Sequence, residues 1–146
     1  MKKLHITIIF ILFFSIFAKS QTSTLTVNIS GFENKSGNVF IAIFDERNKN
    51  SFPKKIEFAI DKKLVKVTND IVSISLENLP LGVYAISVFH DENSNKKLDK
   101  NAFGIPSEAF GMSGDYTALG PPKFDNCKFT IKTVKQKIDI EIKSLF

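Results

Sequence analysis

The sequence is poor in the residues that most often build catalytic centres and covalent cross-links. Its 146 residues include one cysteine, two histidines and no tryptophan. One cysteine excludes an intramolecular disulfide, and so few histidines and cysteines leave zinc without its usual ligand set. No G-x-S-x-G turn and no phosphate-binding glycine loop occurs in a suitable context. Serine hydrolases with a nucleophile turn and enzymes with a phosphate-binding glycine loop therefore have no support in the sequence.

Residues 1–20 have the three-part pattern of a secretory signal peptide. Lys2 and Lys3 precede a largely apolar run over 4–17, and Ala18 and Ser20 are small residues suited to a cleavage site. The run of about 14 residues reaches only about 21 Å as a helix, short of a ~30 Å hydrocarbon core. We expect cleavage after Ser20, no membrane span afterwards, no lipid anchor at that site, and a location in the periplasm, at the outer cell surface or in the medium.

The remaining residues, 21–146, have the length of one domain and a nearly balanced charge. Loss of the three lysines in residues 1–20 lowers the formal net charge from +5 to +2, and the other lysines are scattered, so we expect no nucleic-acid partner. A chain of this length can bury a substantial core. Cys127 alternates with Phe129 and Ile131, which predicts a buried and unreactive thiol.

Apolar residues recur with a period of two along most of the chain, which predicts strands. The run 39–44 is apolar at every position, as in a central strand covered on both faces. We expect about seven strands, no helix, and a long loop after the fifth main strand. Two antiparallel sheets packed face to face would bury every apolar face, so we predict an all-β fold, a single antiparallel β-sandwich, with a small barrel as the second choice. The alternating stretches are 25–29, 39–44, 56–60, 64–67, 72–76, 83–89, 129–131 and 138–142.

The loop after the strand at 83–89 has oxygen-bearing side chains at the spacing of a calcium-binding loop. They occupy its first, third, fifth and ninth positions, and a backbone carbonyl at the seventh would add another ligand. One interpretation is a weak Ca²⁺ site, with a Kd on the order of 10⁻⁴–10⁻³ M. The alternative is a solvated polar loop. The candidate ligands are Asp91, Asn93, Asn95, Lys97 (through its carbonyl), Asp99 and Glu108.

Two positions of this loop depart from the calcium-binding pattern. Lys96 stands where the sharp turn favours glycine, and Ala102 stands where a bidentate carboxylate is needed. Asn95 tolerates the left-handed backbone conformation and is expected to take the role of that glycine. Glu108 or Asp115 would have to return toward the loop to supply the missing carboxylate.

Residues 102–123 lack clear periodicity, which is typical of a functional segment or of a loop folded back on the domain. Their large apolar side chains either pin the loop to the sandwich or form an exposed patch for a protein, a glycan or an envelope component. His90, at the end of the preceding strand, is expected to cap strand and loop. The candidate ligand patch is His90, Phe103, Phe110, Met112 and Tyr116.

Several segments resemble the DUF2141 family of uncharacterised bacterial exported proteins. The resemblance implies an exported β-sandwich of unknown function and provides no catalytic residues. The family usually has glycine at the position of Lys96, so the resemblance argues less for an ion in this chain than in its relatives. The turn 79–84 is also similar to that of transthyretin-like and carboxypeptidase-regulatory sandwiches, which suggests an immunoglobulin- or transthyretin-like arrangement. The matching segments are Gly37 with 39–44, 79–85 (LPLGVYA), 90–95 (HDENSN), 98–99 (LD), 104–108 (GIPSE), 110–111 (FG) and 121–124 (PPKF).

These observations favour a non-catalytic binding or structural module of the cell envelope, in which a bound ion would rigidify the loop. One alternative is a hydrolase that uses His90 with Asp91 or Glu108 as acid and base, which requires these groups to converge in a cleft. The other is lectin-like or protein-partner binding through the loop aromatics.

Overall fold

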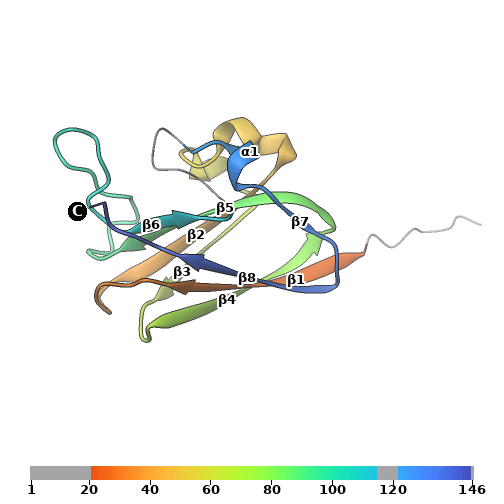
Figure 1. The fold of residues 1–146 in the computed structure, drawn as a ribbon, viewed down its shortest axis with the longest axis horizontal. Coiled ribbons are helices and arrows are strands. Elements are labelled where there is room, and N and C mark those ends of the chain that lie inside the picture. The colour runs from red at the N-terminus through yellow and green to blue at the C-terminus, as the bar shows by residue number, and fades with distance from the viewer. Residues whose placement is uncertain (1–20, 115–121, 146) are drawn as a thin grey trace, which may run out of the picture.

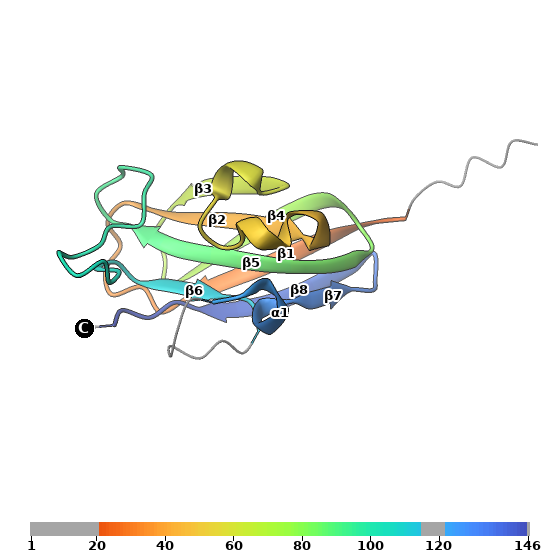
Figure 2. The same ribbon diagram turned by 90° about the horizontal axis from the view of Figure 1, so that it is seen from above.

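The computed structural model describes residues 21–114 and 122–145, and within them eight strands form two stacked sheets (Figures 1 and 2). One sheet has the order β4-β1-β8. The other has the order β3-β2-β5-β6, with β7 also paired to β5. The predicted all-β sandwich is therefore confirmed. The strands are β1 (Thr22–Ser30), β2 (Asn38–Asp45), β3 (Asp61–Lys66), β4 (Ile71–Pro80), β5 (Gly82–Asp91), β6 (Phe110–Met112), β7 (Phe129–Ile131) and β8 (Lys135–Glu141).

The main core lies between the two sheets, where alternate residues of each strand point inward. Leu25, Val27 and Ile29 of β1 face Ile86 and Val88 of β5 across this layer, and all five are buried. At about 25 cal/mol per Å² of apolar surface removed from water, this layer is the principal source of stability.

A second apolar cluster covers the outer face of the five-stranded sheet. β2 is buried on both faces, as its sequence predicts, because Phe40, Ala42 and Phe44 point into this outer cluster. Three short helices lie over part of this face (Figure 1). Phe52, which follows the first of them, and Phe124, which begins the third, belong to the outer cluster, and their rings meet edge-on. These helices are η1 (Glu46–Ser51), η2 (Ile56–Phe58) and α1 (Phe124–Cys127).

Three predictions of local structure are wrong. The alternation at 56–60 forms the 3₁₀ turn η2 instead of a strand, and α1 is a helical turn where none was expected. The sandwich is also not wholly antiparallel, because β8 runs parallel to β1, with Val27 opposite Ile138. Alternation defines which face of a strand is buried but not the direction of its partner, so the sequence pattern could not reveal this pairing.

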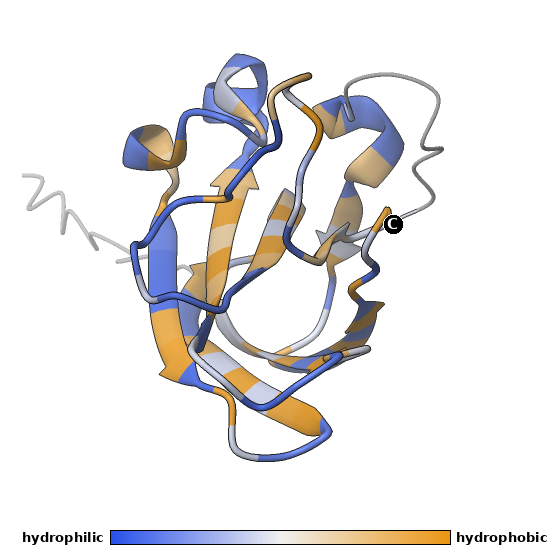
Figure 3. Cartoon of the chain, turned by 90° about the vertical axis from the view of Figure 1, so that its left-hand side faces the viewer, coloured by the Kyte–Doolittle hydropathy of each residue, from blue (hydrophilic) through white to orange (hydrophobic). Residues whose placement is uncertain are grey.

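The connection between β5 and β6, residues 92–109 (the β5–β6 loop), projects from one end of the sandwich (Figures 1 and 2). Figure 3 looks onto that end and shows mostly hydrophilic loops in front of strands with alternating hydrophobic residues. Among the described residues, no helix has the length and apolar character needed to cross a membrane.

Candidate binding site beside the β5–β6 loop

The loop begins at two fully buried polar residues at the end of β5, His90 and Asp91. Asp91 pairs with Asn38 at the start of β2, so its backbone is fixed by the sheet. Gly37 permits this arrangement: its φ is +64°, and a Cβ there would lie 2.1 Å from the Asp91 carbonyl oxygen. The glycine is therefore required both by backbone conformation and by space.

The Asp91 carboxylate holds the first turn of the loop by accepting two backbone hydrogen bonds. Its Oδ1 accepts from the Asn95 amide at 2.9 Å, and its Oδ2 accepts from the Lys96 amide at 2.8 Å. The left-handed residues are Ser94 and Lys96, both with φ of 63°. The expectation that Asn95 takes the left-handed role is therefore wrong, since the chain turns on either side of it to aim both amides at Asp91.

Asp99 closes the loop from the other end. Asn93 Nδ2 donates to its Oδ2 at 2.6 Å, and Asn95 Nδ2 donates to its two oxygens at 2.9 and 3.0 Å. The amide oxygens of Asn93 and Asn95 accept from the backbone N–H groups of Asn95 and Lys97 at 3.1 and 2.8 Å. The structure thus brings four of the predicted calcium ligands together in one hydrogen-bonded turn.

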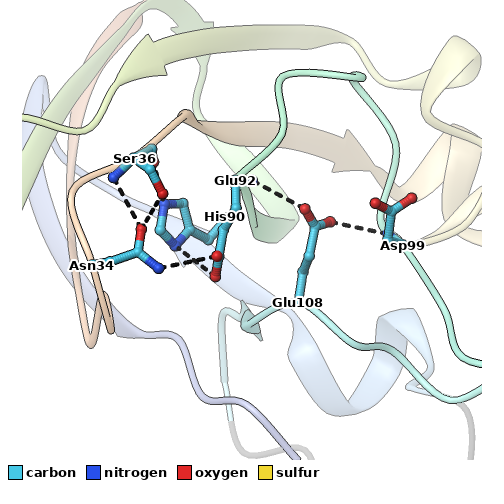
Figure 4. A network of polar contacts seen from close by, with 6 residues as sticks. All are labelled: Asn34, Ser36, His90, Glu92, Asp99 and Glu108. Carbon is cyan, nitrogen blue, oxygen red and sulfur yellow. Dashed lines mark hydrogen bonds and ion pairs between the residues drawn. The ribbon is translucent and has the colours of Figure 1, made fainter.

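Glu108 does return to the loop, as the calcium hypothesis requires of it. Its Oε1 accepts from the Glu92 amide and its Oε2 from the Asp99 amide, both at 3.0 Å (Figure 4). The side chain is 6% exposed. Burial raises the pKa of this carboxyl above its ordinary value; the two amides act in the opposite direction, and the charges of Asp99 and Asp91 raise it further. Within 21–114 and 122–145, no three His, Cys, Asp or Glu side chains are grouped as a metal site.

His90 points to the opposite side of this network, toward the 31–37 turn. Its Nε2–H donates to the Ser36 carbonyl at 2.7 Å, and its ring meets Phe32 edge-on, with centroids 5.2 Å apart. Its Nδ1 has no hydrogen-bond partner and lies 3.7 Å from Glu92 Oε1 (Figure 4). Asn34 connects the same elements, because its Nδ2 donates to Glu92 Oε2 at 3.0 Å. These contacts fit the capping role expected of His90.

A groove of about 290 Å³ lies beside the loop, over the part of the outer sheet face that the three short helices leave open. Its floor is apolar and comes mainly from β5 and β6, and its rim is cationic. Its lining consists of Pro53, Lys54, Ile56, Ser87, Val88, Phe89, Lys96, Lys97, Leu98, Lys100, Phe110 and Met112.

The loop, the groove and most of the sandwich fall within the region matched by one protein-family model. That model, described as "Uncharacterized protein conserved in bacteria (DUF2141)", matches residues 27–139. The chain belongs to the DUF2141 family. Comparisons with curated proteins and with solved structures give no match.

The DUF2141 fold does not gather the whole predicted ligand patch at one place. Phe110 and Met112 line the groove and are partly buried. Phe103 is 88% exposed, away from the groove lining, and His90 is buried on the other face of β5. Tyr116, like the alternative ligand Asp115, lies outside the described residues.

Two features of this DUF2141 domain escaped sequence reasoning. The short strand β6 is one, because Phe110–Met112 has a central glycine and too few residues to show alternation. The lysine rim is the other, since Lys54 lies about forty residues before the rest and only the fold brings it to them. A surplus of unpaired lysines in residues 96–100 was the available signal.

Proposed function

We propose that this DUF2141 domain is an exported, non-catalytic binding module that presents a rigid loop and the groove beside it. The observation that carries the proposal is the double clamp formed by Asp91 and Glu108. Each of these buried carboxylates holds two backbone amides of residues 92–99. This clamp shapes the loop, whose Lys96, Lys97 and Leu98 line the groove.

A hydrolase built on His90 has less support from this geometry. A substrate would have to reach an imidazole that is fully buried, with Nε2 engaged by Ser36 and with Phe32 against the ring. Asp91 and Glu108 already direct all four carboxylate oxygens to backbone amides. A general base needs an accessible lone pair within reach of the reacting proton.

Calcium is the second part of the proposal. Each carboxylate oxygen has lone pairs beyond the one used by an amide, so Asp91, Asp99 and Glu108 retain capacity for a hard cation after the clamp is formed. Amide oxygens of Asn93 and Asn95 and the Lys97 carbonyl would complete the oxygen set. The bound ion would stiffen a loop that already folds through hydrogen bonds, so its contribution to stability would be modest.

Thermal unfolding of the exported protein, recovered from cells that express the full chain, tests the calcium part. Melts are compared in EDTA and in about 2 mM Ca²⁺. For a Kd of about 0.2 mM, linkage gives roughly 1.4 kcal/mol of stabilisation, or roughly a 3–6 °C rise in Tm for a domain of this size. Asp99→Asn should remove the rise, whereas Asp70→Asn, at an exposed ion pair with Lys35, should keep it. Identical wild-type melts would refute the calcium site.

Mass spectrometry of the same material tests export. The expected product begins at Gln21. Retention of residues 1–20 in all of the recovered protein would contradict the signal-peptide interpretation and, with it, the proposed location in the periplasm, at the surface or in the medium.

A further inference from the structure

We propose that the groove binds a soluble, single-chain amphiphile with an anionic headgroup, of the fatty-acid carboxylate type. The inference deepens the proposed function and rests on it, because it names the ligand class of the module. It follows from three properties of the groove: an apolar floor, a rim of lysines that form no ion pair among the described residues, and neighbouring carboxylates that accept hydrogen bonds from amides of the loop.

The floor is a continuation of the domain's outer apolar cluster, and no helix of the described residues covers it. Phe89 of β5 stacks on Phe40 with ring centroids 5.0 Å apart, so the floor has a rigid base. Phe110 and Met112 of β6 and Leu98 of the loop are only partly buried around it. Apolar side chains that line a concavity, rather than standing singly on a convex surface, are typical of small-molecule sites.

The size of the groove favours a slender ligand. Its volume of about 290 Å³ is at the lower end of the range for ligand sites. A single alkyl chain can lie along such a floor, whereas a folded protein surface cannot enter it.

The rim is positively charged, and its charges come from two separate segments. Lys54 follows the η1 segment, and Lys96, Lys97 and Lys100 belong to the β5–β6 loop. All four side chains are exposed. In the described part of the chain, none of the four takes part in an ion pair.

Within the described residues, no acidic side chain of this loop forms an ion pair with these lysines. Asp91 and Glu108 are buried and accept from backbone amides, and Asp99 accepts from Asn93 and Asn95. Among residues 21–114 and 122–145, no Asp or Glu lines the groove. An anion at the rim would therefore meet several ammonium groups that are not held in ion pairs, and its alkyl chain would lie on the apolar floor. Charge complementarity at the rim selects the sign of the headgroup.

Isothermal titration of the exported protein with octanoate, decanoate and dodecanoate, each kept monomeric, tests the proposal. Each added methylene that enters the groove should raise the affinity about fourfold, corresponding to about 0.8 kcal/mol per buried CH₂, until the groove is full. Raising NaCl to about 0.5 M should weaken binding because it screens the exposed lysines. Decyltrimethylammonium, with a chain of the same length and the opposite charge, should bind far more weakly than decanoate.

A pair of matched double variants separates the rim from general charge. Lys54→Gln with Lys100→Gln removes two rim charges and should raise the Kd of decanoate roughly 2- to 20-fold, since each exposed ion pair accounts for a factor of about 1.4 to 5. Lys66→Gln with Lys132→Gln removes two exposed charges that do not line the groove and should leave the Kd unchanged. All four positions are at the surface, so both variants should fold, and a thermal melt checks this.

The inference is overturned if decyltrimethylammonium binds as well as decanoate, if the two double variants weaken binding equally, or if anionic phosphatidylglycerol vesicles are bound while decanoate is not. A separate assay addresses the proposed function itself. Cleavage of p-nitrophenyl decanoate that is lost in His90→Ala would refute a non-catalytic module, whatever the charge preference of the groove.

Discussion

Lys96 occupies a backbone conformation that suits glycine, and this gives a prediction with a definite sign. Its φ is 63°, and its amide donates to Asp91 Oδ2 at 2.8 Å. The left-handed conformation lets this amide reach the carboxylate, so the strain is the consequence of the clamp. Replacing the side chain by hydrogen should relieve the strain and keep the hydrogen bond, because the bond uses only the backbone.

The magnitude follows from two opposing terms. A residue with a Cβ loses about 1–2 kcal/mol in the left-handed region, and glycine loses about 0.5–1 kcal/mol more conformational entropy than alanine on folding. Lys96→Gly should therefore be more stable than Lys96→Ala by roughly 0.5–1 kcal/mol. At Lys97, which does not have a positive φ, the entropy term acts alone, and Lys97→Gly should be less stable than Lys97→Ala by a similar amount.

Urea melts of the four variants measure these differences, and comparing glycine with alanine at each position cancels the loss of the lysine charge. The expected result is a change of sign between adjacent positions, corresponding to roughly 2–6 °C in Tm at each. If Gly is no better than Ala at residue 96, residue 96 is not left-handed and the Asp91 clamp does not have the geometry described.

Two further predictions concern titrating groups. Burial raises the pKa of Glu108 above its ordinary 4.5, so the native state binds this proton more tightly than the unfolded state does. The resulting contribution to stability is lost as pH rises from about 4.5 through the folded pKa. In urea melts, Glu108→Gln should therefore gain stability relative to wild type across that window, and a pH-independent difference would contradict this. Burial raises the pKa of the Cys127 thiol to about 11, so 5,5′-dithiobis(2-nitrobenzoate) at pH 8 should label the protein rapidly only after denaturation; fast labelling of the native protein would contradict the buried position.

The sequence was informative about strands whose side chains alternate strictly. β1 follows period two over its full length, and β4 does so from Ile71 to Glu77. The uninterrupted apolar run of β2 correctly indicated burial on both faces. The sequence was uninformative about segments whose conformation depends on the neighbouring strands and helices. The 56–60 alternation became a 3₁₀ turn that helps to cover the outer cluster, and β6 forms because β5 offers it an edge at Ser87 to Phe89.

The hydrogen bonding of the candidate site could not be predicted from the sequence. Asp91, Asn93, Asn95 and Asp99 lie in one hydrogen-bonded turn, and Glu108 returns to it. Spacing could not show that the carboxylates accept backbone amides, because an amide and a cation are alternative partners for the same oxygens. The burial of Cys127 was predicted correctly, although it lies in α1 rather than on an alternating strand.

The β5–β6 loop would contact both the proposed ion, through its oxygen ligands, and the proposed ligand, through its groove-lining side chains. Asp91 accepts from the backbone amides of Asn95 and Lys96, and Asp99 accepts from the Asn95 side chain. The turn held in this way carries Lys96, Lys97 and Leu98, which line the groove. An ion that lowers the entropy of this backbone lowers the cost of ordering the groove wall, so it should raise the affinity for the anion. Linkage requires the anion to raise the calcium affinity by the same factor. Lys96 takes part in both proposed sites. Its strained backbone donates to Asp91, and its side chain adds a positive charge to the groove rim.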